Sequence, residues 1–221
     1  MSNAAFYREL RDRTDVLWET IFDHPFVKGI GDGSLARERF EFYLLQDYVY
    51  LIDFSRVLAL ACAKAPTLNE MGTFAALLHV TLNTEMALHR KTCAAFGIPE
   101  TELVKTRKSP VTTAYTDFLA RAGYEGDFSD LLAVLLPCAC GYVEIGIRLK
   151  SQGLPDNPFY RDWIDTYSSA EFREFADWLI ERMNEHAAGV PAQLRERWHR
   201  LYETSARHEF LFFDMSWKKE G

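Results

Sequence analysis

Apolar residues recur along almost the whole chain at the three- and four-residue spacing of an α-helix. Phe6, Leu10 and Leu17 begin a first helix of this kind, which we expect to end near residues 24–25. The alternation of apolar and polar residues that is typical of a half-buried strand is nearly absent. The pattern therefore predicts an all-α protein.

Glycine and proline divide the rest of the chain into further helices. Residues 25–33 are rich in glycine and are expected to form a turn, after which Ser34 is a suitable N-cap for the next helix. Short loops between about eight helices favour a single-domain helical bundle over residues 1–221. The predicted helices after the first cover about residues 35–65, 68–96, 110–122, 129–150, 158–166, 170–188 and 191–217.

Composition and charge limit the environment and the partners of this bundle. The 221 residues are 48% hydrophobic and 14% aromatic, which is enough for a large core. A net charge of −7 argues against nucleic acid or an anionic membrane as partner, because both require clustered Lys and Arg. The longest apolar run, residues 131–143, is shorter than the roughly 20 residues that span a bilayer. Residues 1–6 show no secretory pattern, so we expect a cytoplasmic protein.

The four cysteines indicate reduced thiols rather than a disulfide framework or a zinc site. Cys62, Cys93, Cys138 and Cys140 have no regular spacing. Cys138 and Cys140 lie two positions apart on one predicted helix and point in different directions, which does not suit a shared tetrahedral metal ion. We therefore predict no metal site.

Residues 135–146 form the most unusual helical segment, because they combine a proline, two thiols, a tyrosine and a carboxylate. Pro137 removes a backbone donor and is expected to kink the helix just before Cys138. Such a kink would present the Cys138 thiol at a functional site. The alternative is that the thiol packs as a small apolar side chain, and this segment alone leaves both open.

Function in a helical bundle usually depends on polar residues that face its core. Asp47 and Tyr50 lie three apart and share an apolar face, although an ordinary buried aspartate paired with Tyr or Arg would look the same. Cys138 and Tyr142 lie four apart and share another face. Glu209 lies within an aromatic cluster, where burial would raise its pKa. A carboxylate at the rim of the bundle, facing water or another subunit, is the alternative for Glu209.

Two other classes of function remain open at this point. A helical di-iron site uses a pair of Glu-x-x-His motifs, and residues 85–89 have one residue too many and no second copy. His24 is a possible haem ligand, although His24 followed by proline also fits a helix end. A haem- or di-iron-binding redox bundle and a non-catalytic regulatory protein are therefore retained as alternatives.

Taken together and in order, several motifs resemble those of the TenA (thiaminase II) family, from about residue 20 to the C-terminus. The resemblance implies a haem-oxygenase-like all-α fold without haem, a homotetramer and no cofactor. It also implies hydrolysis of 4-amino-5-aminomethyl-2-methylpyrimidine to the hydroxymethyl pyrimidine of thiamine salvage, with cleavage of thiamine as a further activity. The motifs are residues 24–33, 45–47, 85–89, 136–138 and 142–146.

The same resemblance assigns roles to individual residues. Cys138 corresponds to the nucleophile of the cysteine-containing branch, Glu209 to the glutamate of the last helix, and Asp47 to the aspartate that pairs with the pyrimidine. The sequence departs from the family pattern at residues 111–114, 166–169 and 206–208, which concerns substrate preference more than reaction type. The pocket tyrosines implied are Tyr50, Tyr115, Tyr142 and Tyr167.

These residue types suit the implied chemistry. A Cys138 thiolate that adds to the pyrimidine ring makes the ring electron-rich enough to expel ammonia from the aminomethyl carbon. Asp47 can hydrogen-bond a ring nitrogen and the exocyclic amine. Glu209 can protonate the departing amine and then help to deprotonate water. The expected ligand is a small pyrimidine, and the chemistry requires no metal or organic cofactor.

Overall fold

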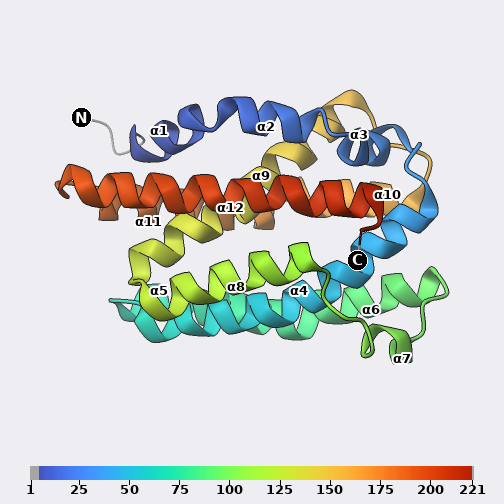
Figure 1. The fold of residues 1–221 in the computed structure, drawn as a ribbon, viewed down its shortest axis with the longest axis horizontal. Helices are drawn as coiled ribbons and strands as arrows, with labels where there is room; N and C mark the ends of the chain where they lie inside the picture. The colour runs from blue at the N-terminus through green and yellow to red at the C-terminus, as the bar shows by residue number, and fades with distance from the viewer. Residues whose placement is uncertain (1–4, 221) are drawn as a thin grey trace. The chain divides into compact units, whose positions relative to one another are not determined.

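The computed structural model describes residues 5–220, which form twelve α-helices and one π-helical segment, with no strand in this range (Figure 1). The prediction of an all-α fold is confirmed. In chain order the elements are α1 (Ala5–Arg13), α2 (Asp15–Phe22), α3 (Pro25–Asp32), α4 (Arg37–Lys64), α5 (Leu68–Val80), η1 (Thr81–Glu85), α6 (Met86–Ala95), α7 (Glu100–Leu103), α8 (Pro110–Glu125), α9 (Phe128–Gln152), α10 (Pro158–Tyr167), α11 (Ala170–His186) and α12 (Ala192–Lys218).

The prediction of a turn over residues 25–33 is wrong, because α3 occupies this segment. Pro25 provides the first-turn φ of a helix, and the His24 side chain caps it by accepting a hydrogen bond from Phe26 N. Gly29 lets the following segment pass close to α3, because a Cβ at this position would lie only 3.1 Å from the backbone of Leu35. The helix ends at Gly33, whose φ of 79° is left-handed.

The boundaries of two other predicted helices also differ. Ser34 is not the N-cap of α4; that position is Ala36, while Ser34 N donates to the side chain of Asp32. The first predicted helix is divided at Thr14, whose hydroxyl donates to Leu10 O at 3.1 Å. Thr side chains that bond to the backbone in this way compete with regular helix geometry.

The predicted helix over residues 68–96 is helical throughout but contains the π-helical turn η1 between α5 and α6. A π-helical turn adds a residue to the helical repeat, so the residues after it face a different direction from the one that a regular α-helix would give them. The orientation of α6 therefore could not be read from the apolar spacing of α5.

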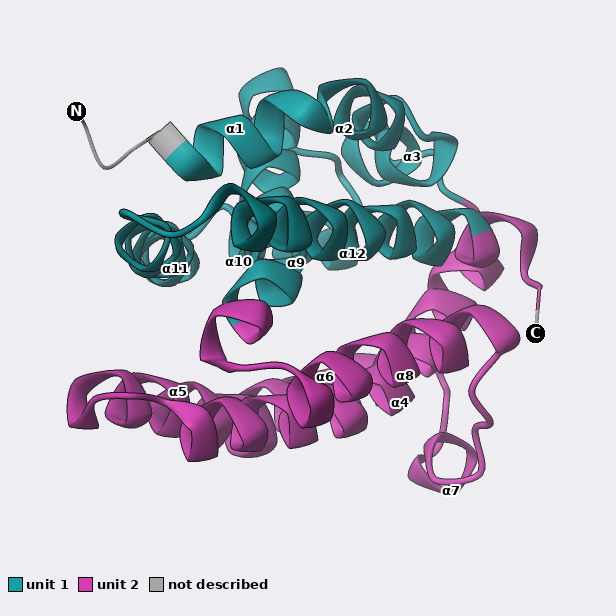
Figure 2. Cartoon of the chain, turned by 60° about the vertical axis from the view of Figure 1, so that its left-hand side comes forward, with its two compact units in different colours: residues 1–35, 132–214 teal, residues 36–131, 215–221 magenta. Residues whose placement is uncertain are grey.

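The chain forms two compact units (Figure 2). Unit 1 comprises the chain up to Leu35 together with Leu132–Asp214, and unit 2 comprises Ala36–Leu131 together with the chain from Met215 onward. The long helices α9 and α12 each contribute to both units. The single domain expected from the sequence stays a prediction.

The core of unit 1 is built around α9 and its aromatic neighbours. Trp18 of α2 lies against Gly141 of α9, where an added Cβ would be only 2.0 Å from the indole ring. Phe26 of α3 packs against Phe213 of α12 with ring centroids 5.7 Å apart. Both phenylalanines are fully buried, so this packing fixes α3 against α12.

In unit 2, a buried amide joins α4 to the start of α8. Gln46 Oε1 accepts hydrogen bonds from Ser109 N at 2.9 Å and from Thr112 Oγ1 at 2.7 Å. Its Nε2 donates to Arg107 O at 3.1 Å. All three bonds satisfy a polar group that is costly to bury, and they hold the α4 segment next to Asp47 in one register.

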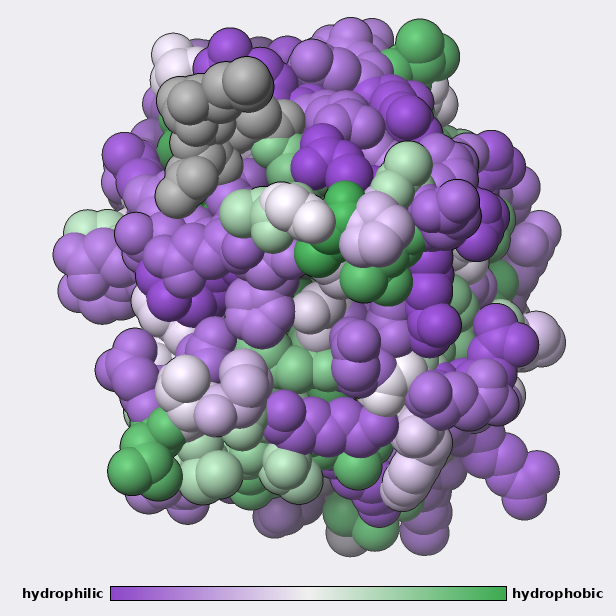
Figure 3. All heavy atoms as spheres, turned by 90° about the vertical axis from the view of Figure 1, so that its left-hand side faces the viewer, coloured by the Kyte–Doolittle hydropathy of each residue, from purple (hydrophilic) through white to green (hydrophobic). Residues whose placement is uncertain are grey.

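One helix, α9, is long and apolar enough to cross a membrane by length and composition, although 83% of the relevant window is buried within the protein. Burial of this kind is typical of a core helix. On the face shown in Figure 3, polar residues dominate and apolar side chains appear in small separate groups.

Candidate functional site

The residues singled out from the sequence form two sets, one in each unit, and each set is described by itself. Asp47 and Tyr50 of α4 and Tyr115 of α8 belong to unit 2. The second set belongs to unit 1 and consists of Cys138 and Tyr142 of α9, Tyr167 at the end of α10, and Glu209 of α12. That the two sets form one site stays a prediction.

In unit 1, Tyr142 and Tyr167 lie together in an aromatic cluster. Their ring centroids are 4.7 Å apart, and Trp163 lies 4.6 Å from Tyr167. This contact depends on Gly146, one turn beyond Tyr142, because a Cβ there would lie 2.8 Å from the backbone of Tyr167 and of Ser168. The glycine thus allows the end of α10 to approach α9 closely enough for the two tyrosines to meet.

Two contacts show that α9 and α12 lie side by side and run in the same direction. Ser205 Oγ donates to Val134 O at 2.7 Å, and eight residues further along each helix the rings of Tyr142 and Phe213 are 5.7 Å apart. Cys138 and Glu209 occupy the midpoints of these two eight-residue stretches.

Residues four apart share a helix face, so the pairing brings Cys138 and Glu209 to the same level of the facing helices. Cys138 is half-buried, whereas Glu209 is only 2% exposed. The alternative of a Glu209 that faces water at the rim is therefore wrong.

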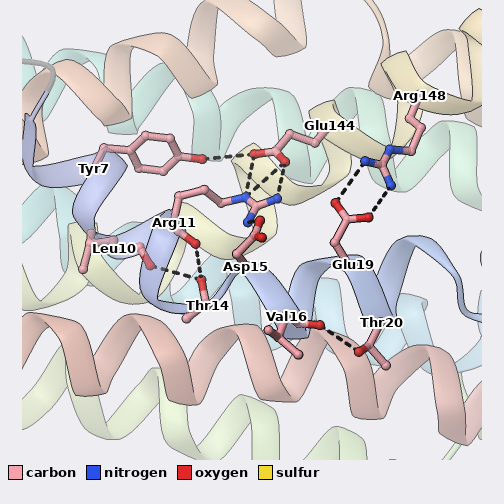
Figure 4. A network of polar contacts seen from close by, with 10 residues as sticks. All are labelled: Tyr7, Leu10, Arg11, Thr14, Asp15, Val16, Glu19, Thr20, Glu144 and Arg148. Carbon is pink, nitrogen blue, oxygen red and sulfur yellow. Dashed lines mark hydrogen bonds and ion pairs between the residues drawn. The ribbon is translucent and has the colours of Figure 1, made fainter.

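Cys140 and Glu144, which lie close to this pair in sequence, have structural roles. Cys140 is buried, with Sγ 4.0 Å from Ala176 O, and burial raises the pKa of its thiol, which keeps it protonated. Cys140 is therefore a core thiol. The Glu144 carboxylate accepts hydrogen bonds from the Arg11 guanidinium at 3.1–3.3 Å and from Tyr7 Oη at 3.4 Å, which ties α1 to α9 (Figure 4).

In unit 2, Asp47 is paired with a histidine rather than with the Tyr or Arg considered from the sequence. His89 Nε2 of α6 lies 3.3 Å from Asp47 Oδ2, and its Nδ1 lies 3.5 Å from Cys93 Sγ. From the sequence, His89 was noted only within residues 85–89, both as an imperfect di-iron motif and as one of the family motifs, and Cys93 had no role. Their four-residue spacing, which places both on one helix face, was the available signal.

The charges around Asp47 shift the pKa values of its neighbours. Burial by itself lowers the pKa of His89, but the interactions with Asp47 and Cys93 outweigh it and raise that pKa to about 9. Glu85, one turn before His89, has its pKa raised to about 7 by burial and by the negative charge of Asp47. At neutral pH His89 is therefore an imidazolium between two carboxyl groups.

The tyrosines of unit 2 contact each other. Tyr50 and Tyr115 have ring centroids 5.2 Å apart, and Phe54 stacks on Tyr50 at 5.6 Å. Tyr115 is 1% exposed. The structure thus brings Tyr115 to Tyr50 despite the unusual sequence that precedes it.

His24, considered as a haem ligand, has both ring nitrogens engaged within the protein. Nδ1 accepts the capping hydrogen bond of α3, and Nε2 lies 3.6 Å from Asp214 Oδ1. The two ring nitrogens of His89 lie 3.3 Å from Asp47 Oδ2 and 3.5 Å from Cys93 Sγ. Among residues 5–220, no group of three or more His, Cys, Asp or Glu side chains is arranged to hold a metal ion.

The chain is similar to curated proteins over almost its whole length. It is 42% identical over 216 residues to an aminopyrimidine aminohydrolase of Halalkalibacterium halodurans, covering 97% of this chain and 96% of that protein. It is 37% identical over 216 residues to an aminopyrimidine aminohydrolase of Bacillus subtilis, covering 98% of this chain and 91% of that protein.

Solved structures show the same architecture. A protein of Silicibacter sp., named a TenA family transcription regulator, superimposes with a TM-score of 0.88 at 36% identity and covers 96% of each chain. A domain of Shewanella denitrificans with a haem-oxygenase-like fold has a TM-score of 0.73 at 15% identity, covering 96% of this chain and 92% of that one, which shows the fold alone. The haem-oxygenase-like fold expected from the sequence is confirmed. The model of the TENA/THI-4/PQQC family matches residues 11–219, and the chain belongs to this family.

Proposed function

We propose that this protein is a cofactor-independent hydrolase of thiamine salvage that converts 4-amino-5-aminomethyl-2-methylpyrimidine and water to the hydroxymethyl pyrimidine and ammonia. The two aminopyrimidine aminohydrolases that resemble the whole chain support this activity. The observation that carries the proposal is the pairing of α9 with α12, which brings a half-buried thiol and a buried carboxylate to one level.

In the proposed reaction, the Cys138 thiolate adds to the ring carbon next to the one that bears the aminomethyl group. The electron pair displaced into the ring expels the amine, which takes a proton from Glu209 and leaves as ammonia. Water, deprotonated by the Glu209 carboxylate, adds to the exocyclic carbon. The electron pair then returns through the ring and expels the Cys138 thiolate, so the enzyme is regenerated.

The remaining residues of the site are proposed to bind the pyrimidine. The Asp47 carboxylate accepts hydrogen bonds from the exocyclic amine and from a protonated ring nitrogen. The tyrosines contribute flat apolar surfaces and hydroxyl groups for stacking and hydrogen bonding. They are Tyr50, Tyr115, Tyr142 and Tyr167.

Ammonia release from the aminomethyl pyrimidine tests this function directly. Cys138→Ala is expected to abolish turnover, because the nucleophile is lost. Cys140→Ala is the matched control: it removes a buried thiol two residues away and is expected to leave turnover intact. A Cys138→Ala protein with full activity would show that the nucleophile is assigned wrongly.

A regulatory role is the second candidate, because the similar Silicibacter protein is named a transcription regulator. The net charge of −7 disfavours direct contact with DNA. Ammonia release without DNA binding at physiological salt would favour the hydrolase, and DNA binding without ammonia release would favour the regulator.

The proposal extends to the setting of the enzyme. We propose a homotetramer in the cytoplasm, made of one domain per chain, that also cleaves thiamine. Sedimentation velocity tests the tetramer. Parallel assays with thiamine and the aminomethyl pyrimidine test the substrate range.

A further inference from the structure

Asp47 has one carboxylate oxygen engaged and one that is not. Its Oδ2 lies 3.3 Å from His89 Nε2, and among residues 5–220 no hydrogen bond or ion pair involves Oδ1. The side chain is 16% exposed, so a ligand can reach it, while the His89 side chain is only 7% exposed. His89 therefore contacts Asp47 on its buried side, and Oδ1 remains available to a ligand.

The order Cys93, His89, Asp47 resembles the triad of a cysteine nucleophile, its base and an orienting carboxylate. Cys93, however, is completely buried. A nucleophile must reach its substrate, so Cys93 does not act as one. Of the three residues, Asp47 is the one that a ligand can reach. Cys93 instead supports the far side of the imidazole at 3.5 Å.

The position of His89 depends on the π-helical turn that precedes it. Thr81–Glu85 form η1, and α6 starts directly afterwards. Both η1 and α6 pack against α4, which carries Asp47. Because a π-helical turn costs stability and tends to persist at functional sites, its place beside Glu85 and His89 is a second indication that these residues have a function.

The positive charge of His89 distinguishes it from a neutral hydrogen-bond donor at the same position. The groups that face His89 are Asp47 of α4, Glu85 of η1 and Cys93 of α6, with the Tyr48 ring 5.9 Å away. A positive imidazolium at 3.3 Å attracts the Asp47 carboxylate, whereas a neutral side chain at the same position would not.

We infer that His89 is a positioning residue of the pyrimidine site, whose charged ring holds Asp47 so that Oδ1 accepts the hydrogen bond from the amino group of the substrate. This inference rests on the proposed function. It adds a residue that acts through Asp47 and does not touch the substrate. The Glu85 carboxyl group tunes the same pair by its own charge.

His89→Gln tests the inference, because glutamine can still donate a hydrogen bond but has no charge. His79→Gln is the matched control: the same substitution at an exposed histidine of the preceding helix α5. Binding of the product pyrimidine, which cannot turn over, is measured by calorimetry from about pH 6 to about pH 10, a range that includes the pKa of His89. Steady-state ammonia release gives kcat and KM. Protonation of the ligand itself is the same for every protein and cancels in the comparison.

For His89→Gln we expect KM to rise about tenfold with a much smaller change in kcat. We also expect the affinity difference between the wild type and His89→Gln to disappear as the pH rises through about 9, because the wild-type His89 then loses its charge. His79→Gln should match the wild type. The same comparison is repeated with Glu85→Gln added to both the wild type and His89→Gln, which removes any contribution from the titration of Glu85. The affinity difference due to His89 should persist.

Two results would overturn the inference while the proposed function stands. One is a His89→Gln protein that binds and turns over like the wild type at every pH. The other is an affinity loss by the same factor at every pH, which would indicate a purely structural role. A wild-type protein that neither binds the pyrimidine nor releases ammonia would overturn the proposed function and this inference with it.

A second measurement applies even if His89→Gln does not fold. Histidine titration by NMR should show one imidazole with a pKa near 9 in the wild-type protein, and this pKa should fall toward 6.5 in Asp47→Asn. If no histidine depends on Asp47 in this way, His89 does not hold the carboxylate and the inference is wrong.

Discussion

Replacing Gly141 with alanine should destabilise the protein, although alanine is the better helix former. An added Cβ would lie 2.0 Å from Cη2 and 2.4 Å from Cζ3 of Trp18. Carbon atoms pack at about 3.5–4.0 Å, so the ring or the helix must move by about 1.5 Å. Trp18 is 1% exposed and lies between Phe22 and the Arg11 guanidinium, which leaves the indole little space.

The magnitude follows from two opposing contributions. Overpacking of this kind costs about 1–3 kcal/mol, and the higher helix propensity of alanine returns about 1 kcal/mol. We therefore expect the free energy of unfolding to fall by up to about 2 kcal/mol, which for a chain of this size lowers Tm by up to about 8 °C.

Gly72→Ala is the matched control, because Gly72 also lies inside a helix but has no atom within 4 Å of the added Cβ. We expect this substitution to stabilise the protein by about 0.5–1 kcal/mol. Urea unfolding followed by circular dichroism measures both variants. If Gly141→Ala is as stable as Gly72→Ala, the close packing of Trp18 against α9 is wrong.

Two further predictions concern the site. Gly146→Ala should force the backbone of Tyr167 away from α9, since the added Cβ would lie 2.8 Å from it. We expect kcat/KM for the aminomethyl pyrimidine to fall about 10- to 100-fold. Activity equal to that of Gly72→Ala would contradict this. The second concerns stability and pH. The pKa of His89 is lowered by burial but raised overall, from 6.5 to about 9, so the folded protein holds a proton that the unfolded chain releases. The resulting stability, about 3 kcal/mol, is complete below pH 6.5 and is lost as the pH rises through about 9. Urea unfolding between pH 6.5 and 9.5 should show this loss in the wild type and a flatter profile in His89→Gln; parallel profiles would refute it.

The unexpected α3 shows where local sequence signals compete. The glycines of residues 25–33 favour a turn when the segment is considered alone. In the folded protein the absence of a side chain serves packing instead, because Leu149 lies 2.7 Å from the position of a Cβ at Gly31. The apolar residues Phe26 and Ile30 are fully buried, and their burial outweighs the low helix propensity of glycine.

Residue spacing was enough to predict most of the helices, although not α3, and the residues that share a helix face. The spacing of apolar residues fixes both, because the helical repeat is a local property of the backbone. For this reason two pairs of residues could be placed on shared helix faces before any tertiary contact was known. They are Cys138 with Tyr142 and Asp47 with Tyr50. Motifs in the right order likewise indicated the family.

Which helix faces meet depends on how the helices pack together in three dimensions. The pairing of Cys138 with Glu209 depends on two contacts between α9 and α12, helices that are far apart in the sequence. The partner of Asp47 depends on a π-helical turn that rotates His89 toward α4. Neither follows from residue spacing, because the direction of a helix face becomes a contact only when another helix packs against it.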